Sequence, residues 1–332
     1  MERAPTLLPG AEEHLHQRLF DGLEAVDVRL RAVVDHEDPF IAEAAGHLAS
    51  AGGKRFRPLL TLLCSEVADG INPRVVEAAT GVELTHLASL YHDDVMDEAE
   101  LRRGVQSANV RYGNATSILV GDLLFGTASS VIAELGPEAV RVQAATFVRL
   151  CAGQIRDERP PAADEDPVAY YRSVLADKTG SLIATSARYG AMFGGADPEV
   201  VDVLTTFGER LGIVFQMSDD VLDVVSDAAD FGKEPGADLR EGKVTLPVLY
   251  VLSAQPRADD ERLLELLGSP ISDPADVVEA VRLLREHPAM GQAREHLAQL
   301  ATETRALLDD LGTAPAVEAL RGLVDEVAGR SQ

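Results

Sequence analysis

Apolar residues recur every three or four positions through most of the chain, which is the spacing of one face of an α-helix. Leu84, Leu87, Ala88 and Tyr91 form one such series, and alternating patterns typical of strands are rare. Segments rich in Gly, Pro and Asn interrupt these series and favour turns. The pattern therefore predicts an all-α protein of about a dozen helices joined by short loops.

The length and composition are sufficient for one large core. The chain has 332 residues, of which 46% are hydrophobic. Because nothing in the pattern demands a second core, we expect a single domain over residues 1–332, built as a helical bundle. The longest polar, Gly-containing interruption, residues 226–243, is a candidate lid.

The charge balance excludes several partners. A formal net charge of -25 repels nucleic acid and anionic membrane surfaces. Residues 1–20 contain three glutamates and lack the apolar stretch of a signal peptide. No run approaches the roughly 20 apolar residues that span a bilayer, so we expect a cytoplasmic protein without stable membrane insertion.

Two short acidic clusters share one spacing. Asp93-Asp94-Val95-Met96-Asp97 and Asp219-Asp220-Val221-Leu222-Asp223 each lie in an apolar helical segment. On a helix, the first and last Asp stack one turn apart, and such like charges favour a bound cation. One copy of this Asp spacing is weak evidence, because it can arise by chance. Two copies, each flanked by apolar residues, predict a pair of Mg²⁺ sites.

Basic residues complement the two acidic clusters. A turn before a predicted helix contains Gly52-Gly53-Lys54-Arg55-Phe56-Arg57-Pro58, and Arg102-Arg103-Gly104 follows the first acidic cluster. Lys178, Lys233 and Lys243 lie farther along the chain. Together these cations predict a site for two polyanions, one bridged by metal and one held directly by Lys and Arg.

From Gly52 to about Leu249, the ordered motifs resemble those of the trans-isoprenyl diphosphate synthases, the polyprenyl synthetase family. The resemblance implies the isoprenoid synthase type I fold around a central apolar cavity. It also implies extension of an allylic diphosphate with isopentenyl diphosphate, a Mg²⁺ requirement of about three ions, and a homodimer.

The resemblance assigns roles residue by residue. Six residues would hold Mg²⁺ on the allylic diphosphate: Asp93, Asp94, Asp97, Asp219, Asp220 and Asp223. The basic groups on that diphosphate would be Arg102, Lys178 and Lys233, with Lys243 as a further substrate-binding residue. The diphosphate of isopentenyl diphosphate would contact Lys54, Arg57, His86 and Arg103. The reacting centre would be lined by Thr179 and Gln216.

Small residues precede the first acidic cluster on its helix. Ser89 lies one turn before Asp93, Ala88 slightly deeper, and Thr85 two turns before it. Within the family, aromatic residues four or five places before the first Asp stop growth at short products, so a long all-trans product is expected. Close helix packing is the alternative reason for the small residues, and a geranylgeranyl product is the alternative length.

Two other functions remain open at this point. A class I terpene cyclase shares the fold and the first acidic cluster, but it normally has a different second metal motif. The other is non-catalytic, either a regulatory subunit or an acidic helical scaffold whose clusters bind Ca²⁺ weakly. Regulatory subunits tend to lose one acidic cluster, whereas this chain has both.

Overall fold

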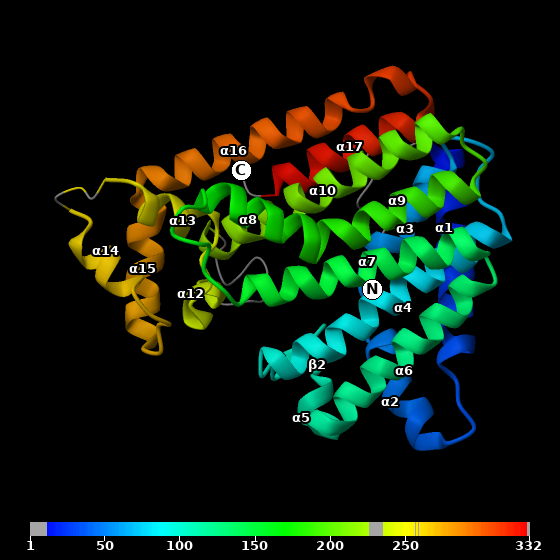
Figure 1. The fold of residues 1–332 in the computed structure, drawn as a ribbon, viewed down its shortest axis with the longest axis horizontal. Coiled ribbons are helices and arrows are strands. Elements are labelled where there is room, and N and C mark those ends of the chain that lie inside the picture. Colours follow the sequence, from blue (N-terminus) through cyan, green and yellow to red (C-terminus); the bar gives the residue numbers. More distant parts are fainter. Residues whose placement is uncertain (1–11, 226–234, 256, 258, 331–332) are drawn as a thin grey trace. The chain divides into compact units, whose positions relative to one another are not determined.

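A computed structural model describes residues 12–225, 235–255, 257 and 259–330 (Figure 1). In these residues the all-α prediction is confirmed, since one two-residue antiparallel hairpin is the only sheet that they form. The chain divides into two compact units. The first contains the described residues within 1–150, 181–209 and 308–323, and the second those within 151–180, 210–307 and 324–332. The single domain over residues 1–332 and its central cavity stay predictions.

The first unit is built mainly from α1 to α6 and α9. Its elements are α1 (Glu13–Val34), α2 (Pro39–Ser50), α3 (Phe56–Ser65), α4 (Pro73–Met96), β1 (Leu101–Arg102), β2 (Val105–Gln106), α5 (Ala108–Tyr112), α6 (Asn114–Ala133), α9 (Ser181–Phe193) and η3 (Asp309–Leu311). The helices with residues in both units are α7 (Pro137–Asp157), α10 (Pro198–Val225) and α17 (Pro315–Gly329).

The sequence explains why α4 begins at Pro73. The Asn72 side chain accepts hydrogen bonds from the backbone N–H groups of Arg74 and Val75, and Pro73 occupies the first turn. Both features favour a helix start, because they satisfy or remove N–H groups that have no partner within the helix. The helix ends with the first acidic cluster, where the backbone N–H of Asp97 donates to the carbonyl of Asp93 at 2.8 Å.

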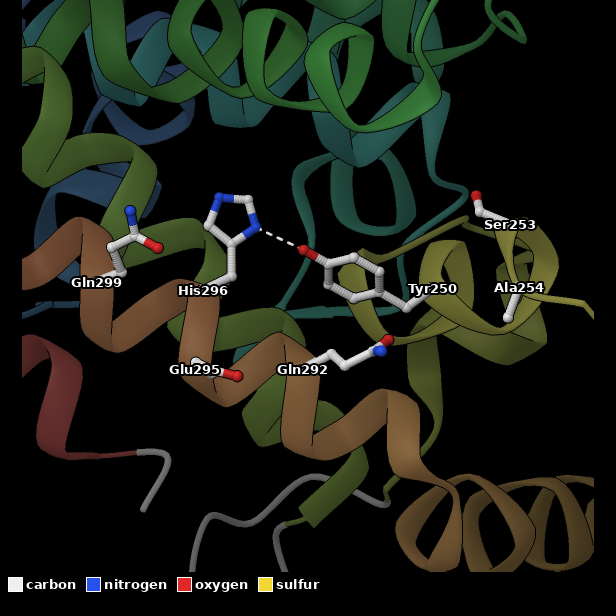
Figure 2. Close-up of a pocket in the computed structure, with 7 residues that line it drawn as sticks. All are labelled: Tyr250, Ser253, Ala254, Gln292, Glu295, His296 and Gln299. Carbon is white, nitrogen blue, oxygen red and sulfur yellow. Dashed lines mark hydrogen bonds between the residues drawn. The ribbon is translucent and has the colours of Figure 1, made fainter.

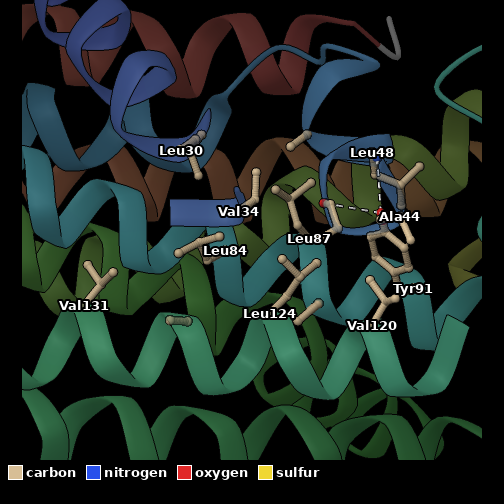
Figure 3. Packing of buried hydrophobic residues seen from close by; sticks show 14 of the residues in the cluster. Leu30, Val34, Ala44, Leu48, Leu84, Leu87, Tyr91, Val120, Leu124 and Val131 are labelled. Atoms are coloured by element: carbon tan, nitrogen blue, oxygen red, sulfur yellow. Dashed lines mark hydrogen bonds between the residues drawn. The ribbon is translucent and has the colours of Figure 1, made fainter. Parts of the chain in front are cut away.

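Helix α4 packs against α1, α3, α6 and α9, and Figure 1 shows it beside α6. Figure 3 shows the apolar cluster in which buried residues of α4 and α6 meet those of α1 and α2. Within it the Tyr91 hydroxyl donates to the carbonyl of Ala44, which gives this buried phenol a partner. The two helices approach closely at Gly121, where an added Cβ would collide with the imidazole of His92. This packing fixes the segment that carries the first acidic cluster.

Helix α6 corrects one expectation about membranes. By length and composition Asn114–Ala133 is apolar enough to cross a bilayer, although 39% of its most apolar window is buried against the rest of the protein. The expectation that no segment approaches such a span is therefore wrong. Val120 and Leu124 are buried against the core, whereas Leu119 and Leu123 are exposed. The helix is apolar on both its buried and its exposed face, which explains why the expectation failed.

The second unit contains the ends of α7 and α17 and the part of α10 from Arg210 onward. Its remaining elements are α8 (Pro167–Leu175), the π-helix η2 (Ala176–Gly180), α12 (Ala237–Glu241), α13 (Leu246–Ser253), α14 (Glu261–Leu266), α15 (Pro274–Glu286) and α16 (Pro288–Ala306). Single-turn π-helices are rare and are often found at functional sites. Here the π-helix contains Lys178 and Thr179, and it passes so close to α7 that a Cβ on Gly153 would collide with the Lys178 backbone.

Candidate functional site

The first acidic cluster lies at the C-terminal end of α4, where the helix dipole is negative. Its middle residue is buried. Asp94 accepts from Nε of Arg102 at 2.6 Å and from the backbone N–H of Ala108 at 3.1 Å. Because each oxygen of Asp94 has a protein donor, this residue orients Arg102. The Asp97 side chain is 29% exposed and lies 3.8 Å from Arg102.

The predicted basic residues of the first unit gather beside the same segment of α4. Arg103 donates to the carbonyl of Gly52, and the imidazole of His86 is close enough to Arg57 and Arg103 for their charges to act on it. Burial and these positive charges lower the pKa of His86 well below its ordinary value. The histidine is therefore neutral, and it offers both a donor and an acceptor. Lys54 is exposed.

Arg57 is the clearest sign of an anion site. Its Nε is buried and lacks a hydrogen-bond partner within the described part of the chain. Burial lowers the pKa of Arg57 to about 10, while the nearby carboxylates of Glu83 and Asp93 act in the opposite direction. A buried guanidinium with an unpaired N–H is costly, and an anionic ligand would supply the missing acceptor.

Glu83 holds this basic cluster together, although the sequence did not single it out. This side chain is only 2% exposed. It accepts from Arg55 at 2.8 Å and lies 3.7 Å from Arg103. Both arginines have positive φ, at 50° and 53°, which is uncommon for residues other than glycine and is found at functional sites. The signal in the sequence was its position three residues before His86 on a buried face of the same helix.

The second acidic cluster lies in the last two turns of α10. Asp220 is buried and accepts hydrogen bonds from the phenol of Tyr171 and from Nε2 of Gln216. Both oxygens of Asp223 accept backbone N–H groups at the start of α12, from Ala237 and Asp238. The Asp219 side chain is 42% exposed, and its carboxylate lies 3.3 Å from Arg330.

The carboxylates of this second cluster are short of positive charge. Burial raises the pKa of Asp220 to about 6, and the neighbouring Asp219 acts in the same direction. Burial also raises the pKa of Asp238 to about 7, with added repulsion from Asp223 and Asp220. Asp238 was not among the predicted residues. A cation bound here would relieve this repulsion.

The remaining predicted residues of the second unit lie around η2 and α12. Nζ of Lys178 contacts Asp157 at 2.5 Å, and the Thr179 hydroxyl donates to Oε1 of Gln216 at 3.4 Å. Lys243 pairs with Glu241. Lys233 and the first part of the candidate lid lie outside the described residues. No group of three or more His, Cys, Asp or Glu side chains is arranged around a metal position in the described ranges.

The chain-length candidates all lie on α4. Ala88 is buried within the cluster that joins α4 to α1, α2 and α6. Thr85 is buried too, and its hydroxyl accepts from Gln143 of α7 at 3.0 Å. Ser89 is only partly buried, and its hydroxyl donates to the carbonyl of His86. Ser89 is therefore the candidate least involved in helix packing.

One pocket lies apart from all the predicted residues, on the surface of the second unit. It has a volume of about 590 Å³ and is lined by residues of α13 and α16. Figure 2 shows the hydrogen bond across it, between the Tyr250 hydroxyl and Nδ1 of His296, which are 2.7 Å apart.

The role of Glu83 can be tested through stability. Glu83→Gln leaves the buried Arg55 and Arg103 without their shared anion, so we expect the free energy of unfolding to fall by about 3 kcal/mol. Urea denaturation measures this change. The control is Glu77→Gln on the same helix, which breaks the half-exposed pair with Arg29 and should cost under about 1 kcal/mol. Equal losses in the two variants would contradict the central role of Glu83.

Comparison with known proteins accounts for this arrangement. Residues 38–284 match the model of the polyprenyl synthetase family. The chain is 44% identical over 310 residues to the nonaprenyl diphosphate synthase of Mycobacterium tuberculosis, covering 93% of this chain and 92% of that protein.

Solved structures give the same result for the fold. One is the geranylgeranyl pyrophosphate synthase of Corynebacterium glutamicum complexed with calcium and isoprenyl diphosphate, with TM-score 0.84, 38% identity, and coverage of 96% of this chain and 98% of that one. Another is a decaprenyl diphosphate synthase from Rhodobacter capsulatus, with TM-score 0.87, 31% identity, and coverage of 96% and 99%. The predicted fold class and enzyme class are confirmed, and the chain belongs to the polyprenyl synthetase family.

Proposed function

We propose that this enzyme extends an allylic diphosphate with isopentenyl diphosphate and releases a long-chain all-trans polyprenyl diphosphate. The observation that carries the proposal is the proximity of two clusters from different elements: the acidic cluster at the end of α4 and the basic cluster around Arg57 of α3, on whose charge Asp93 acts. An enzyme that joins two diphosphates needs both a metal-bridged and a metal-free anion site. The basic cluster serves no purpose in a cyclase that takes one diphosphate.

The metal is proposed to be Mg²⁺, with about three ions per site. Calcium in the C. glutamicum structure supports a divalent cation of this kind. Asp93, Asp94 and Asp97 would hold two of the ions and Asp219 the third, with Asp220 and Asp223 in support. Their hard oxygen donors suit Mg²⁺, which usually takes one or two carboxylates and completes its shell with substrate phosphates and water. When bound, Mg²⁺ neutralises negative charge that develops on the departing diphosphate.

The reaction then needs binding and shielding more than a nucleophilic side chain. The allylic C–O bond breaks, and its electron pair leaves with the diphosphate, to which Arg102 and Lys178 would bind. The C3–C4 double bond of isopentenyl diphosphate forms the new C–C bond with the cationic carbon, and a proton is lost from C2 to the released diphosphate. Arg57, Arg103 and the neutral His86 would hold the isopentenyl diphosphate in place.

A long product is favoured over a geranylgeranyl product. Ser89 and Ala88 leave no aromatic side chain one turn below Asp93. The nonaprenyl and decaprenyl synthases among the relatives support the same choice, whereas the C. glutamicum enzyme represents the shorter alternative. The rings of Phe125 on α6 and Phe147 on α7 contact each other with centroids 3.6 Å apart, and they are candidates for the closed end of the product cavity.

Activity and metal dependence are tested together. Purified protein, given farnesyl diphosphate, isopentenyl diphosphate and Mg²⁺, should release diphosphate, stop with EDTA, and resume when Mg²⁺ is restored. Asp93→Ala and Asp219→Ala should lower kcat at least about 100-fold, because transition-state charge loses its counter-ions. Asp202→Ala, at an exposed position of α10, is the control. Circular dichroism verifies each fold.

The other outcomes of this assay decide between the alternatives. A cyclised hydrocarbon would identify a terpene cyclase, and absence of diphosphate release from the wild type would identify a non-catalytic subunit. Full activity in Asp93→Ala would contradict the metal assignment.

Product length is tested at Ser89. A Phe side chain at this partly buried position should shorten the product, because it fills the space one turn below Asp93. Mass spectrometry of the dephosphorylated products measures the change. Thr206→Phe, at an exposed position of α10, should leave the length unchanged. Ala88→Phe is the weaker test, since overpacking the core at Ala88 lowers stability as well. An unaltered product from a folded Ser89→Phe enzyme would mean that the growing chain does not pass Ser89.

The enzyme is also proposed to be a homodimer that buries the outer face of α6. Ile118, Leu119 and Leu123 are 44%, 67% and 40% exposed on this helix, and exposed apolar patches commonly mark protein interfaces. Because these three side chains are uncharged, a second copy of the chain could bury them without providing a charged partner.

Light scattering coupled to size-exclusion chromatography tests the dimer. Leu119→Glu should convert the dimer to a monomer, because the interface would bury an unpaired carboxylate. Val278→Glu, which changes an equally exposed residue of α15, should not. A monomeric wild type, or a Leu119→Glu dimer as tight as the wild type, would refute this interface.

A further inference from the structure

Tyr171 occupies a position in the second unit that the resemblance did not assign. It lies on α8, two turns before Lys178, and its buried phenol donates a hydrogen bond to Oδ2 of Asp220. The other oxygen of Asp220 accepts from Nε2 of Gln216 at 3.1 Å. Gln216 in turn accepts from the Thr179 hydroxyl of the π-helix. One chain of hydrogen bonds therefore joins α8, α10 and η2.

The phenol is a fixed donor. A tyrosine hydroxyl carries one proton, and here that proton is directed at Oδ2 of Asp220. With a side-chain donor on each oxygen, one from α8 and one from α10, the carboxylate plane of Asp220 is held in one orientation.

We propose that Tyr171 is a positioning residue for the metal-binding end of α10, acting through its hydrogen bond to Asp220. Residues that orient metal ligands from behind contribute substantially to metal affinity, and their loss typically costs about 10- to 100-fold. Tyr171 also joins this carboxylate to the π-helix segment that contains Lys178. The inference rests on the proposed function, because it takes the second acidic cluster to be a metal site.

The adjacent tyrosine provides a matched control. The Tyr170 hydroxyl donates to the carbonyls of Arg156 at 2.9 Å and Arg159 at 3.2 Å, and its ring lies under the Arg156 guanidinium. Tyr170→Phe thus removes a phenol from the same helix and leaves the Asp220 hydrogen bond intact. Tyr171→Phe removes only the oxygen that contacts Asp220.

Metal binding is measured on the full-length protein without turnover. Mn²⁺ is titrated in the presence of inorganic diphosphate, and electron paramagnetic resonance reports free Mn²⁺. We expect Tyr171→Phe to raise the Kd for Mn²⁺ about 10-fold and Tyr170→Phe to leave it unchanged. The Mg²⁺ concentration for half-maximal activity should rise in parallel, whereas KM for isopentenyl diphosphate should stay constant.

A double-mutant cycle with Asp220→Asn separates positioning from simple helix packing. In the Asp220→Asn background, Tyr171→Phe should change the Mn²⁺ affinity no further, because the carboxylate through which it acts is gone. If Tyr171 only ties α8 to α10, Tyr171→Phe lowers the midpoint of thermal unfolding but not the Mn²⁺ affinity, and the inference is overturned. If Tyr171→Phe does not fold, Tyr171→His, which retains an N–H donor, should bind Mn²⁺ more tightly than Tyr171→Leu, and equal affinities would overturn it.

Failure of the proposed function gives a different result. If the wild type forms no prenyl product but its Mn²⁺ affinity falls in Tyr171→Phe, the transferase function is refuted and the positioning role stands. If the wild type is active but Tyr171→Phe leaves the Mn²⁺ affinity unchanged, the positioning role is refuted and the transferase function stands.

Discussion

Both acidic clusters are subject to one electrostatic constraint, because each places its carboxylates at the C-terminal end of a helix. The first cluster ends α4, and the second lies in the last two turns of α10. Each helix thus places several like charges at the negative end of its own dipole, an arrangement that costs free energy in the absence of cations. Buried packing around α4 holds its cluster in place despite that cost. Cations bound at each cluster, as the proposed function requires, would offset this cost.

The three aspartates of each cluster have different environments, and helix periodicity explains the difference. In both clusters the second Asp is the buried one, namely Asp94 and Asp220. A step of one residue turns the side chain by about 100°, away from the face of the first Asp and into the helix packing. There it finds protein donors, which are Arg102 and Ala108 for Asp94. The first and last Asp of each cluster are less buried than the second, so the motif combines accessible carboxylates with one that the protein holds in place.

The sequence predicted the helical class and the residues of both acidic clusters, because periodicity and charge spacing are local signals. It did not predict Glu83, Tyr171 or Asp238, because these residues matter through contacts with chain segments that are remote in sequence or through burial. Glu83 belongs to an apolar helix face, and only the structure brings Arg55 and Arg103 to it. The outer face of α6 was missed for a related reason. Its exposed leucines look like core residues until the packing is known.

Buried polar groups usually have a hydrogen-bond partner, as Tyr91 has in the carbonyl of Ala44. Six buried side-chain atoms of the described residues lack one, and among them Nε of Arg57 lies in the basic cluster beside the first acidic cluster. Its Nε lies in a cluster of positive charge that Glu83 balances only in part, and no described residue accepts from it. Selection for stability alone would favour a partner or a smaller side chain at that position. In the proposed function, a diphosphate bound here would supply the missing acceptor, so part of the cost of folding would be recovered as substrate affinity.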